Sequence, residues 1–240
     1  MSVPAAVTPF FVGSSGYQIS RSVRLRSSAS AYFNRTFASG SGETTGTFSA
    51  WVKRGKLGSS QNIFLVGNTG TVYAGIYFDA ADTLSFSRFN ASAQALLTTT
   101  QVFRDPSAWY HIVVAWDSTQ ATASNRVKMY VNGSQITSFS TATYPTQNLD
   151  MYLLNGDGTT PHQIGYYPTS GNYFDGYIAE VNTIKGQQLT PSSFGYTDSN
   201  GVWQPKAYTG TYGTNGFYLQ FNNPTFGPFT YYGAFTGASK

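Results

Sequence analysis

The chain has 240 residues, a length that a single all-β sandwich can reach, and only 10% of them are charged. The net charge of +4 comes from 14 basic and 10 acidic residues, too sparse a charge for a nucleic-acid-binding surface, so no nucleic-acid partner is expected. The absence of cysteine excludes disulfides and thiolate metal sites. No apolar run approaches the length of a membrane span, so no membrane partner is expected either.

Residues 1–20 are expected to form an N-terminal arm. They have a few apolar residues but neither the basic start nor the long apolar core of a secretory signal. The next segment, residues 21–56, contains seven of the fourteen basic residues of the chain. Two interpretations of these cations stay open: a solvated edge that discourages strand addition, and a phosphate-binding patch.

Short alternating runs bounded by Gly, Asn, Ser and Pro follow, and they indicate strands rather than helices. In residues 47–53, Phe48, Ala50 and Val52 share one face, and Trp51 lies on the mostly polar opposite face. Further short strands are predicted at 63–66, at 75–78 and around Leu84 and Phe86.

Residues 109–117 form the strongest predicted strand, because both of its faces are apolar. This pattern places the strand inside the sandwich. A second strand at 126–131 ends in Asn132-Gly133, the dipeptide best suited to a two-residue type I′ hairpin, and residues 134–139 form the returning strand.

The later part of the chain is richer in loops. Residues 161–165 are predicted to form an edge-like strand, and residues 173–184 resume the alternating pattern. Thr190 and Pro191 predict the cap and first residue of a single helical turn. Residues 217–221 are predicted to form a late strand that pairs with an early strand. Residues 222–240 have no clear period, and both an ordered arm on a neighbour and a loose tail remain open.

Three segments, at 109–117, 127–133 and 174–181, stand in a characteristic order with the Asn-Gly hairpin between them. Together they resemble the signature strands of the laminin-G and concanavalin A-like lectin/glucanase superfamily. The resemblance implies an all-β fold, a two-sheet antiparallel jelly-roll sandwich at residues 21–190. Residues 191–240 are then a C-terminal extension that partly returns to the sandwich.

The flanking segments at 17–37, 51–54 and 194–210 indicate a narrower group within this superfamily. The combination resembles LamG-like jelly-roll proteins of tailed bacteriophages. What it implies is a structural protein of the virion that is assembled in the host cytoplasm.

The acidic residues do not form the pair that a sandwich glucanase requires. A retaining enzyme needs two carboxylates ~5.5 Å apart, which on one strand means acids two or four residues apart. The chain has two glutamates, Glu43 and Glu180, and no acid has either spacing from Glu180. Glu180 is therefore interpreted as a structural residue that accepts hydrogen bonds from a neighbouring segment.

The two histidines are not assigned to catalysis either. His111 lies in the most apolar strand and is interpreted as a buried structural residue, and His162 as an exposed loop residue. No catalytic residue is assigned, and no enzymatic activity is expected.

Two groups of loop residues are candidates for calcium, which takes roughly six to eight oxygen ligands. One is Asp79 with Asp82, and the other is Asp150 with Asn155 and Asp157. Neither forms a recognisable calcium loop, and aspartate is also common in turns. Asp79 and Asp82 are kept as candidate metal ligands, and no other cofactor is expected.

Glycan binding requires aromatic faces beside hydrogen-bonding side chains. The segment at 166–173 offers this mixture in a predicted loop, and so does 208–218. The candidate glycan-binding residues are Tyr166, Tyr167, Asn172 and Tyr173. The alternative is that these rings pack on the sandwich edge or on another subunit.

Two functions from different classes follow. The first is a virion structural or decoration protein, a homo-oligomer that contacts other virion proteins. The second is a carbohydrate-binding module for a host polysaccharide, and the two are compatible in one protein. The aromatic residues expected to contact other copies or the particle are Phe10, Phe11, Trp203, Tyr208, Tyr212, Phe226, Phe229 and Tyr231.

Overall fold

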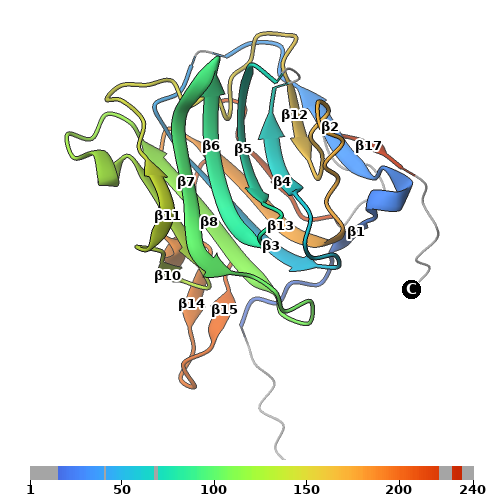
Figure 1. Ribbon diagram of the computed structural model, residues 1–240. Helices are drawn as coiled ribbons and strands as arrows, with labels where there is room; N and C mark the ends of the chain where they lie inside the picture. Colours follow the sequence, from blue (N-terminus) through green and yellow to red (C-terminus); the bar gives the residue numbers. More distant parts are fainter. Residues whose placement is uncertain (1–15, 41, 68–69, 222–228, 234–240) are drawn as a thin grey trace, which may run out of the picture.

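The computed structural model describes residues 16–40, 42–67, 70–221 and 229–233. Within these residues the chain forms two antiparallel sheets that lie face to face, with β4 to β7 in front of β3, β8 and β13 in the view of Figure 1. The predicted two-sheet sandwich is therefore confirmed. No helix in the described part of the chain is long and apolar enough to cross a membrane.

Sheet A contains seven of the described strands. In neighbour order they are β1 (Val23–Leu25), β13 (Gly176–Lys185), β3 (Thr45–Arg54), β8 (Tyr110–Asp117), β9 (Val127–Val131) and β10 (Ser134–Gln135). The seventh, β16 (Phe217–Leu219), pairs with β13 beyond the residues that pair with β1.

Sheet B contains eight of the described strands. In neighbour order they are β11 (Phe139–Thr143), β7 (Ser92–Val102), β6 (Thr83–Asn90), β5 (Val72–Phe78), β4 (Gln61–Val66), β12 (Pro161–Ile164), β2 (Tyr32–Thr36) and β17 (Thr230–Tyr232). The pairing of β17 with β2 joins the end of the described chain to its beginning.

The small elements lie outside both sheets. β14 (Gly195–Thr197) and β15 (Trp203–Pro205) form a separate hairpin, and single 3₁₀ turns occur at η1 (Ser27–Ala29), η2 (Ala123–Asn125) and η3 (Pro191–Ser193). The predicted turn at Pro191 is confirmed. The Asn132-Gly133 hairpin is confirmed too, because both residues have positive φ, 49° and 81°.

The main core lies between the sheets. Phe48, Ala50 and Val52 of β3 are fully buried there, as the alternation predicts. The opposite face of β8 is also covered, because Val113 and Ala115 pack with Phe194 in a second cluster. Residues 189–212 thus form a partial third layer on sheet A, which explains why β8 is apolar on both faces.

Two predictions about pairing are wrong. β12 is not an edge strand: it lies between β4 and β2, and its His162 is fully buried rather than exposed. Pro161 fits there because it is the first residue of the strand. β16 pairs with β13 instead of an early strand, and it is β17 that reaches an early strand.

Candidate binding groove

The candidate calcium ligands Asp79 and Asp82 are both engaged by protein groups. The Asp79 carboxylate accepts hydrogen bonds from its own turn, including one from the Thr83 hydroxyl at 2.6 Å. Asp82 is buried, with carboxylate oxygens 2.9 Å from Nη2 of Arg54 and 3.0 Å from Nε of Arg104. Burial raises the pKa of Asp82, but the Gly58 N–H and the two guanidiniums outweigh it, so the pKa lies below its ordinary value.

These contacts favour the interpretation that Asp79 and Asp82 stabilise turns rather than bind calcium. Asp157 likewise stabilises its own turn, where its carboxylate accepts hydrogen bonds from the N–H groups of Thr159 and Thr160. Nowhere in the described ranges do three or more His, Cys, Asp or Glu side chains gather so as to hold a metal ion. The calcium interpretation therefore gains no support from Asp79 and Asp82.

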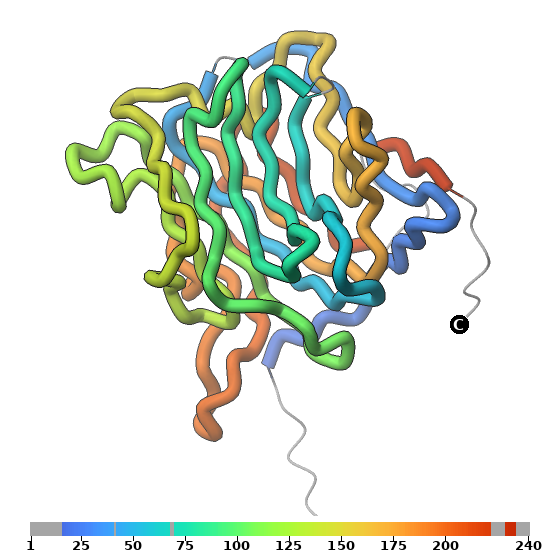
Figure 2. The backbone as a smooth tube through the Cα atoms, viewed as in Figure 1, coloured from blue at the N-terminus to red at the C-terminus, as the bar shows by residue number. Residues whose placement is uncertain are grey.

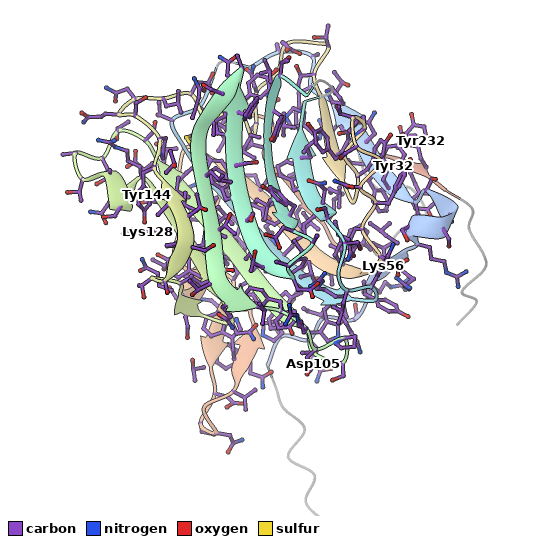
Figure 3. All side chains as sticks on the ribbon, in the orientation of Figure 1. Tyr32, Lys56, Asp105, Lys128, Tyr144 and Tyr232 are labelled. Atoms are coloured by element: carbon purple, nitrogen blue, oxygen red, sulfur yellow. The ribbon has the colours of Figure 1, made fainter. Side chains whose placement is uncertain are left out.

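The loop tyrosines predicted to bind glycans lie at the edge of sheet B. Tyr166 and Tyr173 stack on each other with centroids 4.3 Å apart, and Tyr32 contacts Tyr166 at 4.5 Å. Figure 3 shows Tyr32 beside Tyr232, on which it stacks at 4.8 Å. Burial, with the Tyr173 hydroxyl second, raises the pKa of Tyr166 to about 12.

The structure thus brings Tyr166 and Tyr173 together, but their ring faces pack against each other and against Tyr32. Tyr167 turns toward Tyr73, whose ring lies 5.3 Å away, and Asn172 is half-buried in the same loop. Glycan binding by this loop stays a prediction.

Five of the residues predicted to mediate assembly make contacts within the chain. Tyr208 and Tyr212 pack on the second cluster of sheet A, and Trp203 packs on His111. Phe229 contacts Phe217, and Tyr231 contacts Phe33. Their contact with other copies stays a prediction. Phe10, Phe11 and Phe226 lie outside the described residues.

His111 lies on the outer face of sheet A, in a stack of aromatic rings. The ring of Trp51 is 4.9 Å from it, and Trp203 lies in a nearly parallel plane. Ser49 Oγ is 2.9 Å from Nε2 of His111, a distance that could suggest a nucleophile and its base.

The third partner of His111 decides this question. Trp203 donates its indole N–H to Nδ1 of His111 at 3.0 Å. Because an indole can only donate, Nδ1 is the acceptor and the ring proton is on Nε2. His111 therefore donates to Ser49 and cannot take its proton. Burial also lowers the pKa of His111 to about 3.

Glu180 lies at a bulge in β13, where its φ is 52°. Its Oε2 accepts hydrogen bonds from the hydroxyls of Tyr17, at 2.7 Å, and Tyr218, at 2.6 Å. The prediction that Glu180 accepts structural hydrogen bonds is confirmed. The tyrosine contacts also fix the N-terminal segment, residues 16–22, to the outer face of sheet A.

A groove runs between this segment and the β14–β15 hairpin, which projects beyond the sheets beside the start of the described chain (Figure 2). Its tryptophan end has a volume of about 280 Å³ and is lined by residues 19–22, Trp51, Trp109, Ala179 and Pro205. Its hairpin end, of about 480 Å³, is lined by residues 17–19, Tyr196, Asp198, Gln204 and Pro205. We call this surface the hairpin groove.

The sheet register creates the hollow at the tryptophan end. Trp51 lies opposite Ala179 on one side and His111 on the other. His111 supports one side of the indole, and the small methyl of Ala179 leaves space beside it. Trp109, which is 36% exposed, forms another part of the lining.

The hairpin itself is held in place by close packing of Trp203. A side chain at Gly133 or at Gly195 would collide with the Trp203 ring. Both glycines are thus required for the close approach of the indole to the two hairpins. Through Pro205 and Gln204 this packing sets the position of one wall of the groove.

Sequence reasoning did not identify the hairpin groove. Its one visible signal is Trp51, a large ring on the otherwise polar face of its strand. The ends of the groove combine exposed rings with hydroxyl, amide, carboxylate and guanidinium groups, a mixture typical of sites that bind polar organic ligands.

A family model matches this chain in sequence, and solved structures resemble it in fold. Residues 27–193 match the family described as the concanavalin A-like lectin/glucanases superfamily. The search of curated proteins finds no match. The heptameric SAP-like pentraxin from Limulus polyphemus superposes with a TM-score of 0.50 at 14% identity, over 70% of this chain and 77% of the pentraxin.

Two further solved structures are also similar. The K499G mutant of NanB sialidase from Streptococcus pneumoniae has a TM-score of 0.50 at 17% identity, over 74% of this chain and 28% of the sialidase. The CBM40 of Ruminococcus gnavus IT-sialidase, bound to α2,3 sialyllactose, has a TM-score of 0.46 at 17% identity, over 62% of this chain and 78% of the module. The likeness to these structures is one of fold. Because the family match covers more than half of the 240 residues, the chain belongs to the concanavalin A-like lectin/glucanases superfamily.

Proposed function

We propose that the protein is a carbohydrate-binding module that holds a glycan in the hairpin groove. The observation that carries the proposal is the pair Trp51 and Trp109 in a hollow next to Pro205. Sugar rings present C–H faces that pack on indoles, and hydroxyls that bind polar side chains such as Gln204 at the other end. The family to which the chain belongs includes lectins, which supports the proposal.

We propose binding without hydrolysis. The hydrogen bond from Trp203 gives His111 the tautomer that donates to Ser49, so this pair has no base. Glu180 is engaged by two tyrosine hydroxyls through the same oxygen. A groove with these residues can hold a glycan, but neither the Ser49–His111 pair nor Glu180 supplies an activated nucleophile.

The test is a glycan array followed by calorimetry on the best ligand. Trp109→Ala is expected to weaken binding at least tenfold, because a stacked indole commonly accounts for more than about 1.4 kcal/mol of binding. Tyr232→Ala is the matched control, since Tyr232 is 44% exposed and lies on β17 of the other sheet.

Tyr173→Ala separates the groove from the loop tyrosines. The proposal expects it to leave affinity within twofold of wild type. Loss of binding in Tyr173→Ala but not in Trp109→Ala would assign the glycan to the 166–173 loop instead. No glycan ligand at all would overturn the function.

We propose, as a second function, that the protein is a structural component of a tailed-phage virion and self-associates. The resemblance of its flanking segments to phage LamG-like proteins supports this. A structural observation also favours contact between copies: β11, at one edge of sheet B, contains no charged residue, and Ser140, Thr141, Ala142 and Thr143 are exposed. Charges commonly protect free sheet edges from pairing.

Mass spectrometry of purified virions and light scattering of the isolated protein test this role. The protein is expected in the particles, and as a defined oligomer in solution. Thr141→Lys is expected to shift the oligomer toward monomer, because a lysine would introduce a charge into the edge pairing. Removal of residues 191–240 is not a clean test, since Phe194, Phe217 and Leu219 are buried in the two clusters.

A further inference from the structure

The two ends of the hairpin groove differ in charge. At the tryptophan end, Arg21 is the charged residue in the lining; it is exposed and forms no hydrogen bond or ion pair within the described ranges. Other arginines are committed to partners inside the fold: Arg24 to Asp175, and Arg54 and Arg104 to Asp82. Arg21 thus lines the same end of the groove as Trp51 and Trp109, and its hydrogen-bonding capacity is free for a ligand.

The hairpin end has the opposite charge. Asp198 lines it, and its carboxylate accepts hydrogen bonds from the N–H groups of Asn200 and Val202 and from the amide of Gln204. A separate space of about 10 Å³, which shares Tyr17 and Pro205 with the hairpin end, is lined by one acid and one base, Glu180 and Lys206, so the carboxylate of Asp198 sets the charge of the hairpin end. An anion is therefore repelled from the hairpin end and attracted to Arg21.

We infer that the hairpin groove selects an acidic oligosaccharide, one that carries carboxylate or sulfate groups. The anionic group lies against Arg21, where a guanidinium can form paired charge-assisted hydrogen bonds, and its sugar ring packs on Trp109. The neutral hydroxyls extend past Pro205 toward Gln204 and Asp198. This inference rests on the proposed glycan-binding function and adds the ligand class and its direction in the groove.

The experiment uses matched pairs of ligands with the full-length protein. One arm compares oligogalacturonates with their methyl esters, and another compares sulfated glycosaminoglycan oligosaccharides with their desulfated forms. Wild type is expected to bind at least one acidic member about tenfold more tightly than its neutral counterpart. The arm that shows the preference identifies the anionic group.

Substitutions then test the role of Arg21. Arg21→Gln is expected to remove the preference: it binds the acidic member about tenfold more weakly than wild type does, and its affinities for the acidic and neutral members agree within about twofold. Arg26→Gln is the matched control: it removes the same charge from an exposed arginine that lies outside the groove lining, and it is expected to change affinity less than twofold. Thermal denaturation verifies that both variants are folded.

The outcomes separate this inference from the proposed function. Equal binding of acidic and neutral members, or an undiminished preference in Arg21→Gln, overturns the acidic-ligand inference. In that case, sensitivity of neutral-glycan binding to Trp109→Ala still supports the groove as a glycan site. If no member of any pair binds, the acidic-ligand inference fails, and the glycan array decides the proposed function separately.

Discussion

Trp203 donates its indole N–H to Nδ1 of His111 across 3.0 Å, although 92 positions separate the two residues in the chain. This hydrogen bond attaches the β14–β15 hairpin to the outer face of sheet A. It also determines the tautomer of His111, because an indole nitrogen cannot accept. One contact therefore positions a wall of the hairpin groove and removes the base from the Ser49 pair.

Trp203→Phe is expected to destabilise the protein by about 1–3 kcal/mol, because Nδ1 of the buried His111 loses its donor. Urea denaturation at pH 7.5 measures this change. Trp109→Phe is the control, since Trp109 is more exposed and is expected to change stability by less than about 0.5 kcal/mol. Equal stability of the two variants would show that the hydrogen bond is not important for the fold.

Acid is expected to destabilise the protein through its two histidines. Burial lowers the pKa values of His111 and His162 to about 3, below the ordinary value of 6.5. Between these values the unfolded chain binds protons that the folded chain does not, so stability falls as the pH decreases from 6.5 toward 3. Each histidine contributes a slope of up to about 1.4 kcal/mol per pH unit.

His162→Leu tests this assignment, because His162 lies against the apolar rings of Phe37 and Phe64. The variant is expected to lose about half of the histidine-dependent slope between pH 6 and pH 4 in urea midpoints. A slope identical to that of wild type would mean that His162 does not cause the acid sensitivity.

Glu43 is expected to produce the opposite pH dependence. Burial raises its pKa from 4.5 to about 8. The folded chain then holds a proton that the unfolded chain releases, so stability declines as the pH rises from 4.5 to 8. Glu43→Gln keeps the acceptor for the Leu154 N–H, 2.9 Å away in wild type, and removes the titration. The difference in stability between the variant and wild type is therefore expected to move in favour of the variant from pH 5 to pH 8.5. Urea midpoints of both proteins at the two pH values measure this difference.

The Arg54–Asp82 ion pair offers a matched comparison at a single carboxylate. Arg54→Met is expected to destabilise the protein by about 3–5 kcal/mol, because it leaves a buried charge with less compensation. Arg104→Met removes the other partner, which is 59% exposed, and is expected to cost less than about 1 kcal/mol. Chemical denaturation of both variants measures the difference, and equal costs would contradict the importance of burial for this pair.

Much of the fold could be predicted from local pattern. The faces of β3, the two apolar faces of β8 and the Asn132-Gly133 turn follow from alternation and turn chemistry, which act over a few residues. The position of β12 could not be predicted, because the short run Pro161–Ile164 has the same alternation at an edge as between two strands. Only its pairing with β4 and β2 places it inside the sheet and buries His162.

Residue type and spacing along the chain were sufficient to predict an all-β chain and to show that no acid stands at the glucanase spacing from Glu180, and the resemblance to a known family added the two-sheet sandwich. Which aromatic rings are available to a ligand could be read from the folded chain alone. Tyr166 and Tyr173 stack on each other, whereas Trp51 and Trp109 line a hollow with Arg21. The availability of a ring face depends on what packs against it, and here the packing partners come from distant segments through the register of sheet A and the attachment of the hairpin.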